Sequence, residues 1–141
     1  MNKIFITLIA VLALAVNLSC GNDDLNATTS SQTLNGLWNL TSIEGGFADV
    51  NYQFDVGEIT WNFNLETNLL NVVNNNLEDI ASDGLETGEY NFSIVEFDDI
   101  LLLEINNDSF GSYFIQNNEL IIDQNGETSG NSDGFILGFR R

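Results

Sequence analysis

The sequence predicts an all-β fold, an eight-stranded antiparallel up-and-down barrel that follows an N-terminal signal helix and a flexible tether. Three observations support this prediction. Apolar residues after residue 33 recur with a period of two, as in strands with one buried face. Asn and Gly gather between these segments, and both tolerate the positive φ that tight hairpins require. No helical apolar pattern of useful length follows residue 33.

Residues 1–19 have the layout of a secretory signal. Lys3 precedes an apolar run over residues 4–16, too short for the roughly 20 residues of a membrane-spanning helix. Leu-Ser-Cys follows at residues 18–20 and resembles the lipobox of bacterial lipoproteins, although Asn17 stands where that family prefers Leu. The resemblance implies a lipid on Cys20 that anchors the protein to a membrane. The alternative is an ordinary signal peptide with a cysteine near its cleavage site.

Residues 20–33 are small and polar, which predicts a flexible tether. Asp23 and Asp24 follow the cysteine closely, and this pair resembles the tag that sends some Gram-negative lipoproteins to the outer face of the outer membrane. We therefore expect an exported outer-membrane lipoprotein exposed at the cell surface. A solvated linker without sorting information is the alternative.

The charge of the chain excludes one class of partner. There are 21 Asp and Glu residues against three Lys and Arg. Loss of Lys3 with the signal leaves 2 minus 21, or −19. Nucleic-acid binding depends on cations that neutralise phosphates, so nucleic acid is excluded as a partner. The acidic domain should also stay clear of anionic membrane surfaces.

The folded domain is expected over residues 34–141. Its predicted strands cover residues 38–43, 59–66, 69–73, 89–94, 100–105, 110–116, 120–123 and 135–139. A sandwich and a closed barrel both fit this number of strands. Closure is favoured because an even-numbered meander brings its first strand beside its last. The longer connection over residues 45–57 is expected to hold a short helical lid or an extra strand.

The two ends of the domain carry a motif. Gly36, Leu37 and Trp38 open the first strand, and Arg140 and Arg141 end the last one. This resembles the signature of the lipocalin and wider calycin barrels, in which a cation lies across the indole. It implies a barrel seal made by Gly36, Trp38 and one of the two arginines. A buried tryptophan beside a frayed tail is the alternative.

The chain as a whole is also similar to small bacterial lipocalin-like lipoproteins. The similar segments are residues 36–43, Gly45, Gly46, 59–64, 88–94 and 133–140. The domain is shorter than classical lipocalins, and its single cysteine, Cys20, permits no intrachain disulfide. Within the last strand, only Arg141 shares the side of the apolar residues 135, 137 and 139. Either that strand ends before Arg140 or a bulge resets its phase.

An eight-stranded barrel is filled by its own side chains or holds one small ligand. Trp38 is expected inside, together with eight candidate lining residues: Leu40, Trp61, Phe63, Tyr90, Phe92, Leu102, Phe135 and Leu137. Most of these are large, so a filled or nearly filled interior is favoured.

Little in the sequence indicates catalysis. There is no His, and no Lys follows Lys3, so most acid–base and nucleophilic machinery is missing. The carboxylates Glu86 with Glu89, and Glu96 with Asp98 and Asp99, are best explained as a solvated face. Asp123, Asn125 and Glu127 fail the EF-hand template. We predict no enzyme, no cofactor and no metal site.

Two functions remain open. The first is a carrier, a membrane-anchored barrel that binds a small apolar ligand. The second is a non-enzymatic interaction module with a filled barrel, whose acidic rim or loops contact an envelope protein or polymer. The domain is expected to be monomeric in either case.

Overall fold

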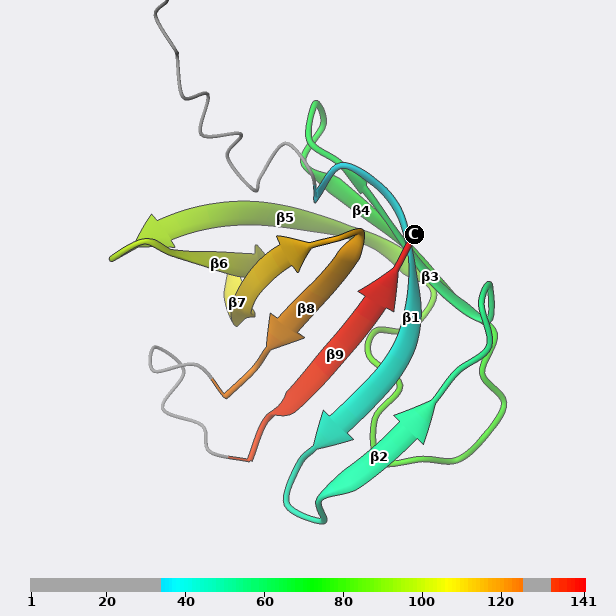
Figure 1. The fold of residues 1–141 in the computed structure, drawn as a ribbon. Helices are drawn as coiled ribbons and strands as arrows, with labels where there is room; N and C mark the ends of the chain where they lie inside the picture. The colour runs from blue at the N-terminus through cyan, green and yellow to red at the C-terminus, as the bar shows by residue number, and fades with distance from the viewer. Residues whose placement is uncertain (1–33, 126–132) are drawn as a thin grey trace, which may run out of the picture.

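The computed structural model describes residues 34–125 and 133–141, so the predicted signal, tether and Cys20 lie outside the described residues. Nine strands make up the fold (Figure 1). They are β1 (Gly36–Gly45), β2 (Val50–Gln53), β3 (Ile59–Asn64), β4 (Leu69–Asn74), β5 (Gly88–Phe97), β6 (Ile100–Ile105), β7 (Asp108–Gln116), β8 (Glu119–Asp123) and β9 (Phe135–Arg140). Among the described residues, no helix is long and apolar enough to cross a membrane.

The sheet closes between β1 and β9, which confirms the predicted eight-stranded antiparallel barrel. Its strands run in the order β1-β3-β4-β5-β6-β7-β8-β9, and β9 pairs back with β1. The remaining strand, β2, is not one of the eight strands that close the barrel. The first part of β1 pairs with β3 and its last part with β2, with Gly45 opposite Val50. Residues 45–57 therefore hold the extra strand, and the alternative prediction of a helical lid is wrong.

Three hairpins of the barrel turn through two residues with positive φ. These pairs are Asp98–Asp99, Asn106–Asn107 and Asn117–Asn118, with φ between 49° and 70°. Such turns match the right-handed twist of the flanking strands, and Asn and Asp are among the few residues that adopt them readily. The acidic pair at residues 98 and 99 is therefore part of a hairpin turn.

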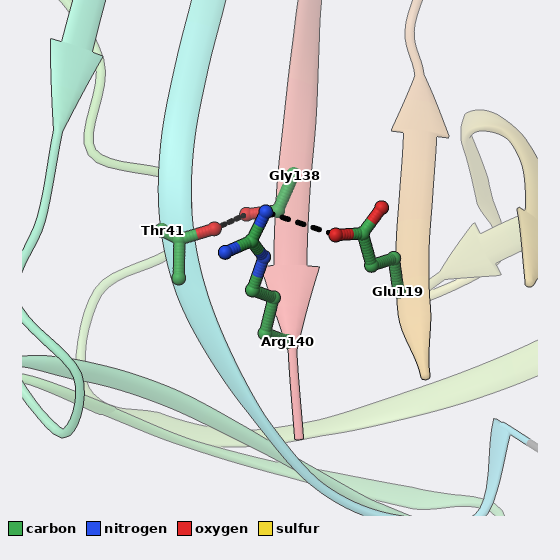
Figure 2. Close-up of polar contacts among 4 residues, drawn as sticks. All are labelled: Thr41, Glu119, Gly138 and Arg140. Atoms are coloured by element: carbon green, nitrogen blue, oxygen red, sulfur yellow. Dashed lines mark hydrogen bonds and ion pairs between the residues drawn. The ribbon is translucent and has the colours of Figure 1, made fainter. Parts of the chain in front are cut away.

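A β-bulge in β1 changes which residues face inward. Leu40 lies opposite Phe139 and Ser42 opposite Gly138, so Thr41 is an extra residue. Its hydroxyl donates a hydrogen bond to the carbonyl oxygen of Gly138 at 3.0 Å (Figure 2). Leu40 and Ile43 are both fully buried as a result. Both options predicted for the last strand are wrong: β9 runs unbroken to Arg140, and the bulge lies in its partner strand β1.

A second bulge lies in β7. Leu103 pairs with Gly111 and Glu104 with Ser109, which leaves Phe110 as the extra residue. Phe110 packs against the core, and its ring centroid is 5.6 Å from that of Trp61. The bulge therefore adds an aromatic ring to the barrel interior.

The predicted interior position of Leu102 is wrong. On β6 the core contains Leu103 and Ile105, with Leu101 packed against it, and Leu102 lies on the opposite face of the strand. Residues 100–103 are all apolar. The sequence therefore shows no alternation of apolar and polar residues there from which the inward face could be predicted.

Candidate functional site

The barrel end at which Leu34 and the C-terminal Arg141 lie is closed around Trp38. Trp38 has no exposed surface, and its Nε1 donates a hydrogen bond to the carbonyl oxygen of Leu34 at 2.8 Å. The Arg141 guanidinium carbon lies 4.2 Å from the centroid of the indole ring. Arg141 also donates a hydrogen bond to the carbonyl oxygen of Asn35 at 2.7 Å. We call Leu34, Asn35, Trp38 and Arg141 the barrel seal.

Gly36 contributes to the seal through its backbone. It begins β1 with a φ of 108°, a conformation that L side chains rarely adopt. Asn35 is held beside it, because its Oδ1 accepts a hydrogen bond from the Leu65 backbone at 2.9 Å. The segment before β1 is thereby fixed across the end of the barrel.

Arg140 lies outside the barrel. Its Nη2 forms an ion pair of 2.9 Å with Glu119 Oε1 (Figure 2). The Arg140 side chain is largely exposed and that of Glu119 about half exposed. The Asn39 side-chain amide donates a hydrogen bond to the Arg140 carbonyl oxygen at 3.2 Å. The two neighbouring arginines thus have different roles, and Arg141 is the one that covers Trp38.

This difference predicts unequal effects of two adjacent substitutions. Arg141→Ala should lower the free energy of unfolding by about 1–2 kcal/mol, because it removes a cation–π contact and a hydrogen bond. Arg140→Ala should cost about 0.5 kcal/mol or less, as exposed ion pairs do. Urea denaturation of both variants measures the difference. Equal losses would contradict the assignment of Arg141 to the seal.

Gly84 and Leu85, near the end of the 75–87 connection between β4 and β5, pack against the interior of the barrel. A Cβ atom added at Gly84 would lie 3.4 Å from Trp61, 3.6 Å from Leu40 and 3.8 Å from Leu137. Leu85 also packs against the core. The backbone at Gly84 therefore lies directly on side chains that line the barrel.

The interior itself is occupied by aromatic rings. The Trp61 ring lies 6.1 Å from that of Phe63 and 5.0 Å from that of Phe139, centroid to centroid. Phe63 meets Phe92 edge to face at 5.2 Å. Such spacings are those of directly packed aromatic pairs. The centre of the barrel is built from ring-to-ring contacts.

Seven of the eight candidate lining residues contribute to this core. Leu40, Trp61, Phe63, Phe92 and Leu137 are buried, and Tyr90 and Phe135 are partly buried against it. Several aromatic residues of this core were absent from the predicted set, among them Phe110, Tyr113 and Phe139. Phe139 continues the alternation of β9 and could have been included, whereas Phe110 faces inward only because of the bulge in β7.

Two buried polar atoms stand out in this apolar interior. Within the described part of the chain, Trp61 Nε1 and Tyr113 Oη are buried without a hydrogen-bond partner. Burial raises the pKa of Tyr113 from 10.0 to about 12, because the phenolate would lose its hydration. Each of these atoms has an unused capacity for a hydrogen bond.

Tyr113 should make the domain sensitive to alkali. Below pH 10 the phenol is protonated in both states; above it, the unfolded chain ionises first, so stability falls as pH rises towards about 12. The loss should approach about 2 kcal/mol. Tyr113→Phe should remove this step and cost little at pH 7, since the hydroxyl is unpaired. Urea denaturation across pH 9–12 measures both effects, and an unchanged alkaline slope in the variant would contradict the prediction.

The acidic candidates that the structure describes lie on the surface or in turns. Glu86, Glu89 and Glu96 are exposed. Asp123 Oδ1 accepts a hydrogen bond from the Asn125 backbone at 2.8 Å, and so supports the chain after β8. Glu127 lies outside the described residues. Over residues 34–125 and 133–141, no group of three or more Cys, Asp or Glu side chains is placed to hold a metal ion.

A polar groove of about 500 Å³ lies between β2 and the start of the 75–87 connection. It is lined by Asn51, Tyr52, Gln53, Phe54, Asp55, Glu58, Asn76, Glu78 and Ile80. The side chains of β2 that line it were not predicted, because β2 itself could not be distinguished from a helical lid. Several groups are already engaged within the protein, including Glu58, whose carboxylate accepts a hydrogen bond from the Asp55 backbone.

Comparison of the chain with protein-family models, curated proteins and solved structures gives no match. The closed antiparallel barrel is compatible with a lipocalin-like fold, and Arg141 lies over the tryptophan of the Gly-x-Trp segment.

Proposed function

We propose that this protein is a non-enzymatic interaction module: a lipid-anchored, lipocalin-like barrel with a filled interior that meets its partner through its outer surface. The observation that carries the proposal is the packing around Trp61. A barrel of this size has room for either its own side chains or one small ligand.

Side chains from several strands meet in the space where a barrel carrier would hold its ligand. Trp61 from β3, Phe110 from β7 and Phe139 from β9 meet with centroid distances of 5.0 and 5.6 Å from the Trp61 ring. Trp61 itself has no exposed surface. The barrel seal covers one end, and residue 84 lies against the interior side chains. These contacts favour an outer surface, and not the interior, as the working part of the molecule.

The proposed anchor is the lipid on Cys20, with residues 20–33 as a tether and Asp23 and Asp24 directing the protein to the outer membrane. A multiply acylated cysteine binds firmly because each buried methylene contributes about 0.8 kcal/mol. Cys20→Ser should release the protein from the membrane fraction, and Ser30→Ala in the tether should not. Membrane attachment of the Cys20→Ser protein would contradict the anchor.

Carriage of a small ligand is the second candidate function. The unpartnered Trp61 Nε1 and Tyr113 Oη favour it, because buried polar groups normally have a hydrogen-bond partner. A small molecule with a hydrogen-bond acceptor, or an ordered water, would satisfy such a group. Apart from these two atoms, the packed interior favours the interaction module.

Native mass spectrometry distinguishes the two functions. The delipidated domain, purified from its own cells under non-denaturing conditions, should have the mass of the polypeptide alone. A tightly associated small molecule, lost in Trp61→Phe or Tyr113→Phe, would establish the carrier and contradict the interaction module.

A further inference from the structure

We propose that the outer face of strands β5–β8 is a docking surface for a basic protein: a partner whose apolar side chains are ringed by lysine and arginine. This deepens the proposed function, on which it rests, by naming the surface and the chemistry of the partner. We call this surface the outer apolar face. It consists of Val95, Phe97, Ile100, Leu102, Phe114 and Ile121.

The pairing of the strands places these residues side by side. Val95 lies opposite Leu102, and Phe97 opposite Ile100. Leu101 lies opposite Tyr113, so Ile100 and Phe114 are the next neighbours on the same two strands. Phe114 in turn lies opposite Ile121. Directly opposed residues have Cβ atoms about 4.5–5.5 Å apart, so the six side chains form a continuous surface across four strands.

This surface is open to solvent. Phe97 and Phe114 are each 55% exposed, and Ile100 and Val95 about 40%. The inward positions of the same strands already supply the core through Leu103, Ile105 and Tyr113, so packing of the barrel does not require apolar residues outside. Single exposed apolar residues are ordinary, but a contiguous group with two phenylalanines marks an interaction surface.

Acidic side chains border the outer apolar face. Asp98 and Asp99 form the β5–β6 turn directly beside Phe97 and Ile100. Glu104 lies on the same side of β6 as Leu102, two residues further along, and accepts a hydrogen bond from Ser93 at 2.7 Å. Glu119 begins β8. Aromatic anchors within a charged rim are the usual anatomy of a protein–protein interface.

The negative charge of the chain indicates which kind of partner can bind the outer apolar face. A second copy would be as acidic as the first, with 21 Asp and Glu against three Lys and Arg, and would be repelled, as would an anionic bilayer. The protein has only Arg140 and Arg141 as basic side chains after Lys3, and Arg140 is paired with Glu119. Complementary cations must therefore come from the partner.

The probe for the experiment is a short labelled peptide of alternating lysine and phenylalanine, added to the delipidated full domain. Fluorescence anisotropy should detect binding that weakens with salt. Phe97→Ser/Phe114→Ser should weaken it by about thirtyfold or more, as expected when interface anchors are lost. Leu37→Ser/Val73→Ser is the matched control, since these residues are similarly exposed on other strands; it should leave binding unchanged.

A second pair of substitutions tests the acidic side chains that border the outer apolar face and leaves the apolar residues unchanged. Asp98→Asn/Asp99→Asn keeps residues that tolerate the positive φ of the turn and should weaken peptide binding by about tenfold, through the loss of two charges. It also keeps the test valid if the phenylalanine variant fails to fold.

Four results would overturn the proposal. These are equal loss of binding in the Leu37→Ser/Val73→Ser control, equal binding of a lysine–serine peptide, self-association in sedimentation that Phe97→Ser/Phe114→Ser abolishes, and binding to phosphatidylcholine vesicles through the same two residues. The third would make the occupant a second copy and the fourth a membrane. None of them adds the mass of a small molecule to the polypeptide in native mass spectrometry, so the proposed function is tested separately.

Discussion

Replacing Trp38 by alanine should lower the free energy of unfolding by about 3–5 kcal/mol, the range for truncating a buried aromatic side chain. Trp38 is fully buried, donates a hydrogen bond to Leu34 at 2.8 Å and supports Arg141 at 4.2 Å. Alanine removes the packing, the hydrogen bond and the aromatic surface under the guanidinium at once. Urea denaturation followed by far-ultraviolet circular dichroism measures the loss.

Two further variants show how much of that loss comes from the indole N–H and how much is specific to position 38. Trp38→Phe keeps a ring beneath Arg141 and loses the indole N–H, so it should cost less, about 1–3 kcal/mol. Leu37→Ala changes the adjacent residue, which is 53% exposed, and should cost about 0.5 kcal/mol or less. A loss below about 1 kcal/mol in Trp38→Ala would mean that the seal does not stabilise the barrel.

Trp61→Ala should have an effect of similar size for a different reason. Its ring packs against Phe63, Phe110 and Phe139 with centroid distances of 5.0 to 6.1 Å. Removal of the indole should cost about 3–5 kcal/mol and leave an apolar cavity at the centre of the barrel. Because such cavities stay dry and accept small apolar molecules, added indole should restore part of the stability.

The rescue by indole tests whether the native interior is filled. At ten times its dissociation constant, indole should raise the stability of Trp61→Ala by about 1.4 kcal/mol. The unmodified protein and the surface variant Val73→Ala should gain nothing. Stabilisation of the unmodified protein by indole would instead indicate an open interior, and would favour the carrier.

The success of the strand predictions has a local cause. Residues 59–64 alternate apolar and polar, and in the structure Ile59, Trp61 and Phe63 are buried while the residues between them are more exposed. The Asn-rich turns likewise act within a few residues, since Asn106–Asn107 and Asn117–Asn118 adopt the positive φ that their hairpins need. Signals of this kind depend only on neighbouring residues, so a sequence can display them.

The errors arose where the orientation of a side chain depends on how two strands pair. Whether Phe110 faces inward depends on the register of β6 against β7. The four consecutive apolar residues at 100–103 do not reveal that Leu102 faces outward. Strand β2 pairs only with the last part of β1, an arrangement that its four residues do not specify by themselves.

The sequence by itself determined the fold class, the positions of the eight barrel strands and the pairing of the first strand with the last. It also determined the acidic character of the protein. Tertiary structure decided which arginine covers Trp38, which rings fill the interior and which apolar residues remain outside. The physical reason is the period of the strand. A bulge of one residue inverts every later side chain, and bulges are set by contacts between strands distant in sequence, as between Thr41 and Gly138.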